Sequence, residues 1–331
     1  MRDFESMPKV ELHVHLEGAI PRTSLWALVE QAGGDPDVPN LAALEHQFRF
    51  RDFDHFIDTW VWKNRFLDSY EAFEVGAEAA ASELAAQNVV YAEAFFSPSD
   101  FSQFGLAPAE LALAIRRGLD RADGVQVALI VDVVRDTGPE RASDTFEEIR
   151  EVAESAGIIG VGLGGSEADF PPELFADVYR RARDAGFRLT AHAGEVSGPD
   201  SVLTALSVLG VERIGHGIRS VEDRDLLKSL VEHQIPLEVC PSSNLATGLV
   251  PSWEEHPIRQ LIDAGAMVTL STDDPAMFAT TLSGEYRTVA TRYGYDDMLM
   301  RQLAQNAVEA SWTDTETRLQ LQQELDLWWD R

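Results

Sequence analysis

Short apolar runs alternate with amphipathic stretches along most of this chain. The first run, Val10–Val14, places apolar and polar residues in strict alternation, which is typical of a β-strand. Seven further runs follow, at Val89–Phe96, Val125–Val134, Ile158–Leu163, Arg188–His192, Arg213–His216, Ile235–Cys240 and Met267–Thr272. Their lengths suit buried strands, so the pattern predicts eight strands.

The stretches between these runs have helical spacing. In Pro199–Leu209, the residues Val202, Leu206 and Leu209 form one apolar stripe that would face a sheet. Several of the predicted helices begin at Pro and end near Gly, as helix termini prefer. They cover Pro21–Ala32, Ser69–Gln87, Pro108–Ala122, Pro139–Ala156, Pro172–Ala185, Pro199–Leu209, Val221–His233, His256–Ala264 and a helical tail over Asp296–Arg331.

This alternation of strands and helices predicts an α/β protein with a parallel sheet. Eight such units close naturally into a (β/α)8 TIM barrel, here with extra helices after strand 1 and at the C-terminus. An open doubly wound sheet is the competing fold, but no Gly-rich phosphate fingerprint follows the first strand. We find no linker or repeat, so residues 1–331 are expected to form a single domain.

The segment between residues 35 and 70 is rich in Phe and Trp. Phe53, Phe56 and Trp60 recur at helical spacing. Two interpretations stay open for this stripe. It is either ordinary core, which we prefer, or an apolar lid over a ligand.

Composition narrows the classes of function. The chain carries a formal net charge of −29, and such a surface repels nucleic acid and anionic membranes. Its only cysteine, Cys240, excludes an internal disulfide framework, and no run is long enough to cross a membrane. The first eight residues lack the features of a signal peptide, so we expect a cytoplasmic protein. The excess of acidic residues, together with only three lysines, suggests a protein adapted to a cell interior of high salt concentration.

Polar residues gather at the predicted strand ends, where barrel enzymes carry their chemistry. They are His13 and His15, Glu93, Gly164-Gly165, His192 with Glu195, His216, Ser242-Ser243 and Asp273-Asp274. Each has an ordinary explanation by itself, such as a core histidine or a helix N-cap. Their convergence on one rim favours a functional site.

Three histidines and one carboxylate from this set suit a zinc ion: His13, His15, His192 and Asp273. The two histidines of the first strand lie one repeat apart and project from the same face. Zinc lowers the pKa of a coordinated water to about 7, so the predicted reaction class is metal-assisted hydrolysis. Glu195 follows a predicted ligand by three positions and can shuttle a proton, and His216 can orient the hydroxide or accept its proton.

Two further residues suit recognition of a flat substrate. Asp274 adjoins a predicted ligand but points elsewhere, and the backbone N–H of Gly165 can approach a ligand closely because no Cβ intervenes.

With these residues the sequence resembles the adenosine deaminase family of metal-dependent amidohydrolases. The resemblance covers nearly the whole chain. It rests on the segments Pro8–Leu16, His192-Ala193-Gly194-Glu195, Gly215-His216-Gly217, Cys240-Pro241-Ser242-Ser243, Asp273-Asp274-Pro275, and Thr281-Leu282 with Glu285-Tyr286.

The resemblance implies four ligands for one Zn²⁺ per chain: His13, His15, His192 and Asp273. It further implies that Glu195 protonates purine N1 and that His216 positions the attacking hydroxide. Hydroxide would then add at C6 and ammonia would leave. A small purine and water are therefore the expected partners, and the oligomeric state stays open.

On the substrate side, the resemblance implies that Asp274 takes part in catalysis and bonds N7, that the Gly165 N–H meets N3, and that His15 also contacts substrate. Glu17 stands where adenosine deaminases usually carry Asp facing the ribose, and Phe95 stands where they often carry Arg. The resemblance favours adenosine and deoxyadenosine, converted to inosine and ammonia (deoxyinosine for the deoxynucleoside) in purine metabolism, as the substrates. The alternatives are free adenine and a modified adenine nucleoside.

Two other classes of protein compete with this interpretation. A purine-binding protein without activity would show damage to the ligand set or to Glu195, and none is present. Amidohydrolases that cleave esters or amides commonly use a carbamylated lysine between two metals. The three lysines here, Lys9, Lys63 and Lys228, all lie away from the predicted strand ends.

Overall fold

Eight parallel strands form the centre of the molecule, and each pairs with the next one in the chain. The computed structural model describes residues 2–331. The strands are β1 (Lys9–His15), β2 (Val89–Phe96), β3 (Gln126–Asp132), β4 (Ile158–Gly162), β5 (Arg188–Ala193), β6 (Arg213–His216), β7 (Leu237–Val239) and β8 (Val268–Leu270). A parallel bridge between Val14 and Asp273 joins the last strand to the first. The predicted (β/α)8 barrel is therefore confirmed.

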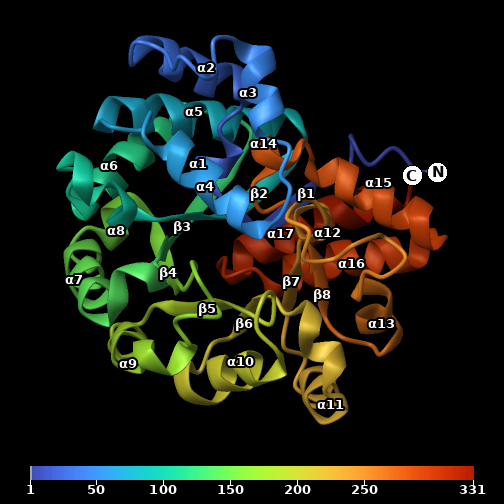
Figure 1. Cartoon of the computed structure of the whole chain (residues 1–331). Helices are drawn as coiled ribbons and strands as arrows, with labels where there is room; N and C mark the ends of the chain where they lie inside the picture. The colour runs from blue at the N-terminus through green and yellow to red at the C-terminus, as the bar shows by residue number, and fades with distance from the viewer. Residues whose placement is uncertain (1) are drawn as a thin grey trace.

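Helices surround this barrel, as Figure 1 shows. They are α1 (Leu16–Ala19), α2 (Arg22–Gln31), α3 (Leu41–Gln47), α4 (Phe53–Asn64), α5 (Tyr70–Ala86), α6 (Pro108–Leu119), α7 (Gly138–Arg150), α8 (Ala153–Ala156), α9 (Ala176–Asp184), α10 (Pro199–Thr204), α11 (Arg224–Glu232), α12 (Pro241–Ala246), α13 (Ile258–Asp263), α14 (Pro275–Phe278), α15 (Leu282–Tyr293), α16 (Asp297–Ala310) and α17 (Thr315–Trp329). The extra helices after β1 and at the C-terminus are present as predicted. No helix among residues 2–331 has the length and apolar character needed to span a bilayer.

The predicted strand boundaries hold best where the apolar run continues to the rim. β2 and β6 match their predicted ranges, whereas β7 and β8 are shorter. At β7, Pro241 occupies the first turn of α12 and lacks the N–H that a ladder needs. Beyond β8 the chain stays buried and keeps isolated pairings: the Ser271 N–H donates to the carbonyl of Val239, and Asp273, with a φ of +66°, bridges to Val14.

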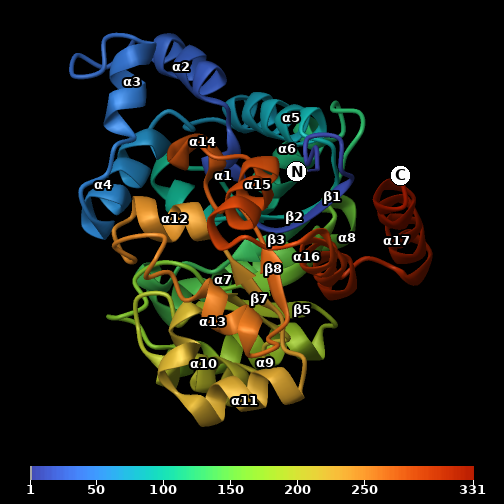
Figure 2. The ribbon, with the colours of Figure 1, turned by 90° about the vertical axis from the view of Figure 1, so that its right-hand side faces the viewer.

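The helices after β1 cover one end of the barrel. Figure 2 shows α4, α12 and α14 together on one side of the strands, with α17 on the opposite side. α4 begins at an N-cap, Asp52, whose side chain accepts a hydrogen bond from the backbone N–H of His55. The helix lies over the end where β1 and β2 finish, which is the end that carries the polar residues.

Candidate metal and active site

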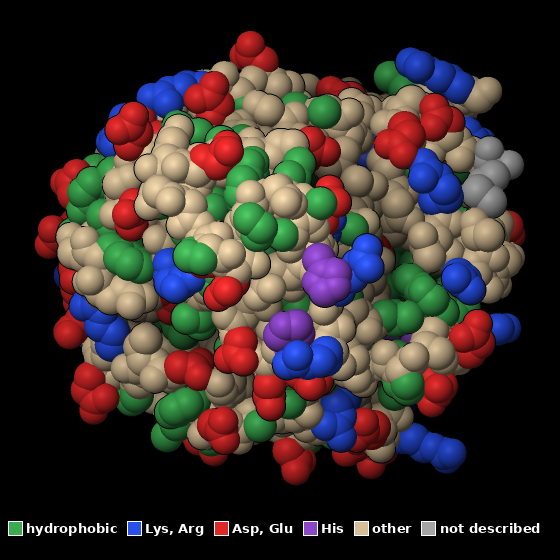
Figure 3. Space-filling view, turned by 45° about the horizontal axis from the view of Figure 1, so that its top comes forward, with side chains coloured by type: hydrophobic (Ala, Val, Ile, Leu, Met, Phe, Trp, Pro, Cys, Tyr) green, Lys and Arg blue, Asp and Glu red, His purple; other side chains and the backbone are tan. Residues whose placement is uncertain are grey.

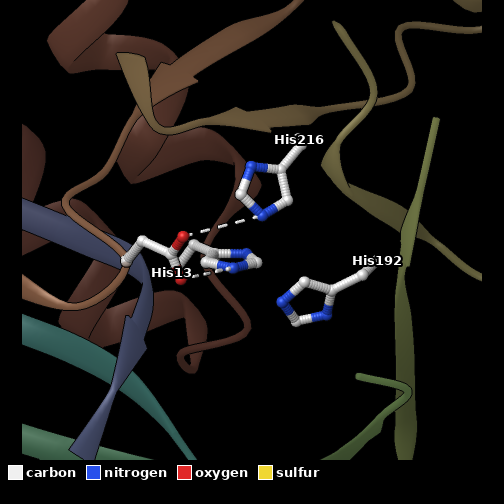
Figure 4. A group of neighbouring side chains, drawn as sticks. His13, His192 and His216 are labelled. Atoms are coloured by element: carbon white, nitrogen blue, oxygen red, sulfur yellow. Dashed lines mark ion pairs between the residues drawn. The ribbon is translucent and has the colours of Figure 1, made fainter. Parts of the chain in front are cut away.

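Five polar side chains from four strand ends converge at the covered end of the barrel: His13 and His15 from β1, His192 from β5, His216 from β6 and Asp273 after β8. Ligand atoms of His13, His192, His216 and Asp273 all lie within 4.8 Å of one another. Figure 4 shows the three labelled imidazoles pointing toward a common point, with dashed ion pairs at His13 and His216. His15 belongs to the same group, because its Nε2 lies 3.3 Å from Asp273 Oδ1 and 3.2 Å from His192 Nε2.

Two of these imidazoles have a defined tautomer. His13 Nδ1 donates to Glu238 Oε2 at 2.8 Å, and His192 Nδ1 donates to the carbonyl of Leu163 at 3.2 Å. In the neutral form, which is the form that binds a metal ion, each of these rings carries its one proton on Nδ1 and presents a lone pair at Nε2. Both lone pairs face the centre of the group. Ring nitrogens held from behind in this way are typical of metal-binding histidines.

The remaining contacts at the centre also suit a cation. Asp273 Oδ2 accepts a hydrogen bond from Ser243 Oγ at 2.6 Å, while Oδ1 faces His13 and His15. His13 Nε2 is buried without a hydrogen-bond partner among residues 2–331. Zinc–nitrogen bonds of tetrahedral geometry separate two ligand atoms by about 3.3 Å, close to the distances at His15. These residues therefore fit a zinc ion.

The electrostatics of the group also favour a positive charge at its centre. Burial lowers the pKa of His13, but the neighbouring carboxylates of Asp273 and Glu238 outweigh it and raise the pKa to about 10. Burial raises the pKa of Asp273, but the neighbouring histidines outweigh it and hold the pKa well below its usual range. A divalent cation would supply the positive charge that the carboxylates of Asp273 and Glu238 attract.

His216 differs from the other rings in its proton position. His256 Nδ1 accepts a hydrogen bond from the backbone N–H of Ile258, so the proton of this ring lies on Nε2 and is donated to Asn244 Oδ1. The Asn244 amide nitrogen then donates to His216 Nδ1 at 3.2 Å. This places the His216 proton on Nε2, which faces Glu195 at 3.6 Å and Asp273 at 3.8 Å. A ring with N–H directed inward is suited to hydrogen bonding rather than to metal ligation.

Glu195 lies on the loop after β5, which a second glutamate holds in place. The Glu167 carboxylate accepts hydrogen bonds from the backbone N–H groups of Gly194, Glu195, Val196 and Ser197 and from Ser201 Oγ. Burial, with the nearby charges of Asp273 and Glu167, raises the pKa of Glu195 well above its ordinary value. The shift favours the protonated carboxyl, which is the form that can act as an acid.

A buried ion network supports the metal-side residues from beneath. Arg213 bonds Glu238 Oε1 and Glu93 Oε2, both at 2.6 Å, and its guanidinium stacks over Trp312 at 3.6 Å. Since Glu238 also holds His13, the network extends from the barrel interior to the site. Fully buried charges persist only when paired in this way.

Backbone strain is concentrated at the site. His216 and Asp273 have φ values of +60° and +66°, in the left-handed region that side chains other than glycine rarely adopt. Each such residue costs of order 1 kcal/mol or more, and both project their side chains into the group.

A cavity of about 280 Å³ opens beside the group. Phe53, Phe56 and Trp60 of α4 line it, so the lid interpretation of this aromatic stripe describes it better than ordinary core. Asp274 and Gly165 also line the cavity. The Asp274 carboxylate lies over Gly18, where a Cβ would come within 1.7 Å of Oδ1, so only glycine leaves this space.

Glu17, a predicted substrate contact, lies behind the cavity wall rather than on it. It is 2% exposed, and its Oε1 accepts a hydrogen bond from the backbone N–H of Ser97 at 2.9 Å. Burial raises its pKa to about 7, opposed by the backbone bond and by Lys63. Its Oε2 has no hydrogen-bond partner among the residues that the structure describes.

Comparison with known proteins is consistent with this geometry. The family model described as adenosine deaminase matches residues 8–328. The chain belongs to the adenosine deaminase family. As a member of this family it is a hydrolytic deaminase of the amidohydrolase superfamily, as its sequence indicated.

Individual relatives in the adenosine deaminase family are similar to this chain over nearly its full length. Aminodeoxyfutalosine deaminase of Streptomyces avermitilis is 37% identical over 337 residues, covering 98% of this chain and 93% of that protein. Adenine deaminase of Agrobacterium fabrum is 35% identical over 316 residues, covering 95% and 96% respectively.

Solved structures of this family superimpose closely. Adenine deaminase from Arthrobacter aurescens has a TM-score of 0.91 at 30% identity, covering 98% of this chain and all of that one. An amidohydrolase from Burkholderia ambifaria, solved with bound zinc, has a TM-score of 0.89 at 29% identity, covering 99% of this chain and 93% of that one.

The sequence alone did not indicate several residues that organise the site. Asn244 and His256 orient His216, Glu167 holds the Glu195 loop, and Glu238 holds His13. A single inward-facing glutamate in a short apolar strand was the available signal for Glu238, because such a charge needs a partner. The other three carry no local pattern that separates them from surface residues.

Proposed function

We propose that this protein deaminates a 6-aminopurine, either adenine or an adenine nucleoside without a 5′-phosphate, giving the 6-oxopurine and ammonia. The observation that carries this proposal is the convergence of His13, His192, His216 and Asp273 at one point, with His15 against Asp273 and Glu195 facing His216. Water supplies the incoming oxygen, and the C6–N bond breaks.

In this proposal His13, His15, His192 and Asp273 hold one zinc ion. Zinc, when bound, lowers the pKa of a water molecule to about 7 and so makes a nucleophile available at neutral pH. These residues form the set predicted from the sequence. His216 is left to orient the nucleophile through its inward N–H, because Asn244 occupies its other nitrogen.

The remaining residues orient and activate the purine. Glu195 donates its proton to N1, which makes C6 more electrophilic. Asp274 bonds N7, and the N–H of Gly165, a cavity-lining residue with a φ of 93°, bonds N3. The aromatic side chains of α4 cover the purine and exclude water from the reacting atoms.

The choice of substrate rests on charge and on the relatives. Adenine and aminodeoxyfutalosine are the substrates in the names of the relatives above, which favours the alternative substrates over adenosine itself. Asp100, Asp132 and Asp136 line the cavity, and none of its lining residues in the described chain is Lys or Arg. A 5′-phosphate would meet these carboxylates without a compensating cation, so nucleotides are disfavoured.

The test is an absorbance screen for conversion of 6-amino to 6-oxo purines by the zinc-loaded enzyme at high salt. Adenine, adenosine, 2′-deoxyadenosine, 5′-deoxy-5′-methylthioadenosine and AMP form the panel. We expect turnover of adenine or an uncharged nucleoside at least tenfold faster than of AMP. Release of no ammonia from any of these compounds contradicts the proposal.

A further inference from the structure

The buried carboxylate of Asp132 has no role in the chemistry described above. Asp132 is the last residue of β3, is 2% exposed and lines the cavity. Its Oδ1 atom lacks a hydrogen-bond partner among residues 2–331. Leaving a buried carboxylate oxygen unpaired is destabilising, so a hydrogen-bond donor from a ligand would recover that loss.

The local structure leaves room for this carboxylate. Asp132 pairs in register with Gly162 of β4. A Cβ on Gly162 would lie 2.9 Å from Asp132 Oδ1, and a Cβ on Gly164 would lie 2.2 Å from Oδ2. Glycine at both positions therefore lets the side chain lie against the end of β4. The nearby cation, Arg135, is occupied by the carbonyls of Phe170 and His192.

The order of strands around the barrel indicates which part of a purine Asp132 would meet. In the proposed pose Asp274, which follows β8, bonds N7 of the purine. Glu195, which follows β5, bonds N1, and Gly165, which follows β4, bonds N3. The perimeter of a purine continues from N3 to N9, and the barrel continues from β4 to β3. The end of β3 adjoins Gly165 directly, since Arg135 N–H donates to the carbonyl of Gly164 at 2.9 Å.

We propose that Asp132 determines substrate specificity by accepting hydrogen bonds from the ribose hydroxyls of an adenine nucleoside. The proposal rests on the deamination proposed above and narrows its substrate to nucleosides. The cavity continues past the purine position toward Asp136, Ser166 and Gln103, which leaves space for a sugar. Asp136 is already occupied by the N–H and hydroxyl of Ser166, so Asp132 is the free acceptor there.

The experiment compares Asp132→Ala with the wild type on adenosine, 2′-deoxyadenosine, 3′-deoxyadenosine, 5′-deoxy-5′-methylthioadenosine and adenine. We expect kcat/KM for the ribonucleosides to fall roughly 10- to 100-fold, and that for adenine to change less than about threefold. Removing the hydroxyl that Asp132 binds should cause a similar loss in the wild type and little further loss in the variant.

Three further variants make the result specific. Asp132→Asn keeps one acceptor oxygen and should give an intermediate loss. Gly164→Ala should displace the carboxylate and reproduce the nucleoside-selective loss. Asp123→Ala, an exposed residue in the loop before β3, is the matched control. Calorimetry on the zinc-loaded proteins should show weaker binding of inosine, but not of hypoxanthine, in Asp132→Ala.

Other outcomes overturn the proposal. A loss of kcat/KM confined to adenine would mean that Asp132 accepts a hydrogen bond from the N9–H of free adenine and not from ribose hydroxyls. An equal loss on all substrates with zinc retained would mean a structural role. If the wild type turns over adenine and none of the nucleosides, there is no ribose for Asp132 to contact, and the proposal is contradicted. Absence of turnover and of inosine binding in the wild type overturns the deaminase proposal itself, before any variant is compared.

Discussion

The two sides of the cavity differ in how far their polar groups are already paired. On the metal side, the outer nitrogens of His13, His192 and His216 each have a protein partner. On the side formed by β3 and β4, the Asp132 carboxylate keeps an unpaired oxygen. The first arrangement fixes the direction of these three rings before a substrate arrives, whereas the second leaves an oxygen for a donor from the substrate. On the metal side His15 is the exception, because its Nδ1 has no hydrogen-bond partner among residues 2–331. In the proposals above, chemistry and specificity therefore belong to different sides of one barrel end.

The strongest test of the metal side removes a ligand. His13→Ala should abolish metal binding and lower kcat/KM by at least about 10³-fold, because it removes a ring nitrogen and leaves Glu238 Oε2 buried without its partner. Zinc content by atomic absorption and turnover of the preferred purine are the measurements. The exposed His46 serves as a control, since His46→Ala should change neither. Full zinc occupancy with full activity in His13→Ala would refute the ligand assignment.

Removing the acid should separate catalysis from metal binding. Glu195→Gln should lower kcat by roughly 10²- to 10⁴-fold, because the amide cannot donate a proton to N1. Zinc should stay near one per chain, since Glu195 is placed outside the ligand set. Steady-state kinetics and metal analysis together decide the matter. Unchanged kcat would remove Glu195 from the mechanism, and loss of zinc would assign it to the metal instead.

The orientation of His216 gives a smaller expected effect. Asn244→Ala should lower kcat by about 10- to 100-fold, because His216 can then adopt the other tautomer and turn its N–H away from the centre. His256→Ala should act through the same path, so the double variant should be little worse than either single one. The pH dependence of kcat should shift in both. His233 is exposed at the end of α11, and its replacement, His233→Ala, is the control that should leave the pH profile of kcat unchanged.

On the substrate side the effects should fall on KM. Ile57→Ala removes apolar contact from the part of α4 that lines the cavity and should raise KM about 3- to 10-fold, with kcat changing less than about threefold. Val75→Ala, at an exposed position of α5, is the matched control. A drop in kcat with KM unchanged would show that α4 acts on the chemistry rather than on binding.

The smallest effect concerns neither side of the cavity but the whole surface. Acidic side chains are spread over the visible face in Figure 3 rather than gathered in one patch. With a net charge of −29, salt should relieve self-repulsion, so raising KCl from about 0.1 M to about 2 M should raise Tm by several degrees. A calorimetric scan without such a rise would contradict adaptation to high salt.

The barrel itself was predictable from the chain because a parallel sheet buries both faces of each strand. That burial leaves continuous apolar runs, of which Val89–Phe96 is a clear example. The ends of β7 and β8 were not predictable, since the residues that follow Val239 and Leu270 stay buried although the regular strands end there. Burial is visible in an apolar pattern, whereas hydrogen bonding is not.

The sequence by itself determined the order of strands and helices and the residue types brought to the rim, including the histidine pair of β1 and the carboxylate after β8. Only the tertiary structure decided which nitrogen of each ring faces the centre, because a tautomer depends on a partner far along the chain, as with Glu238 for His13. The same holds for Asp132, whose oxygen is unpaired because glycines of the neighbouring strand supply space and no donor. Local patterns record what each segment buries, and contacts between distant segments decide what each polar atom can bind.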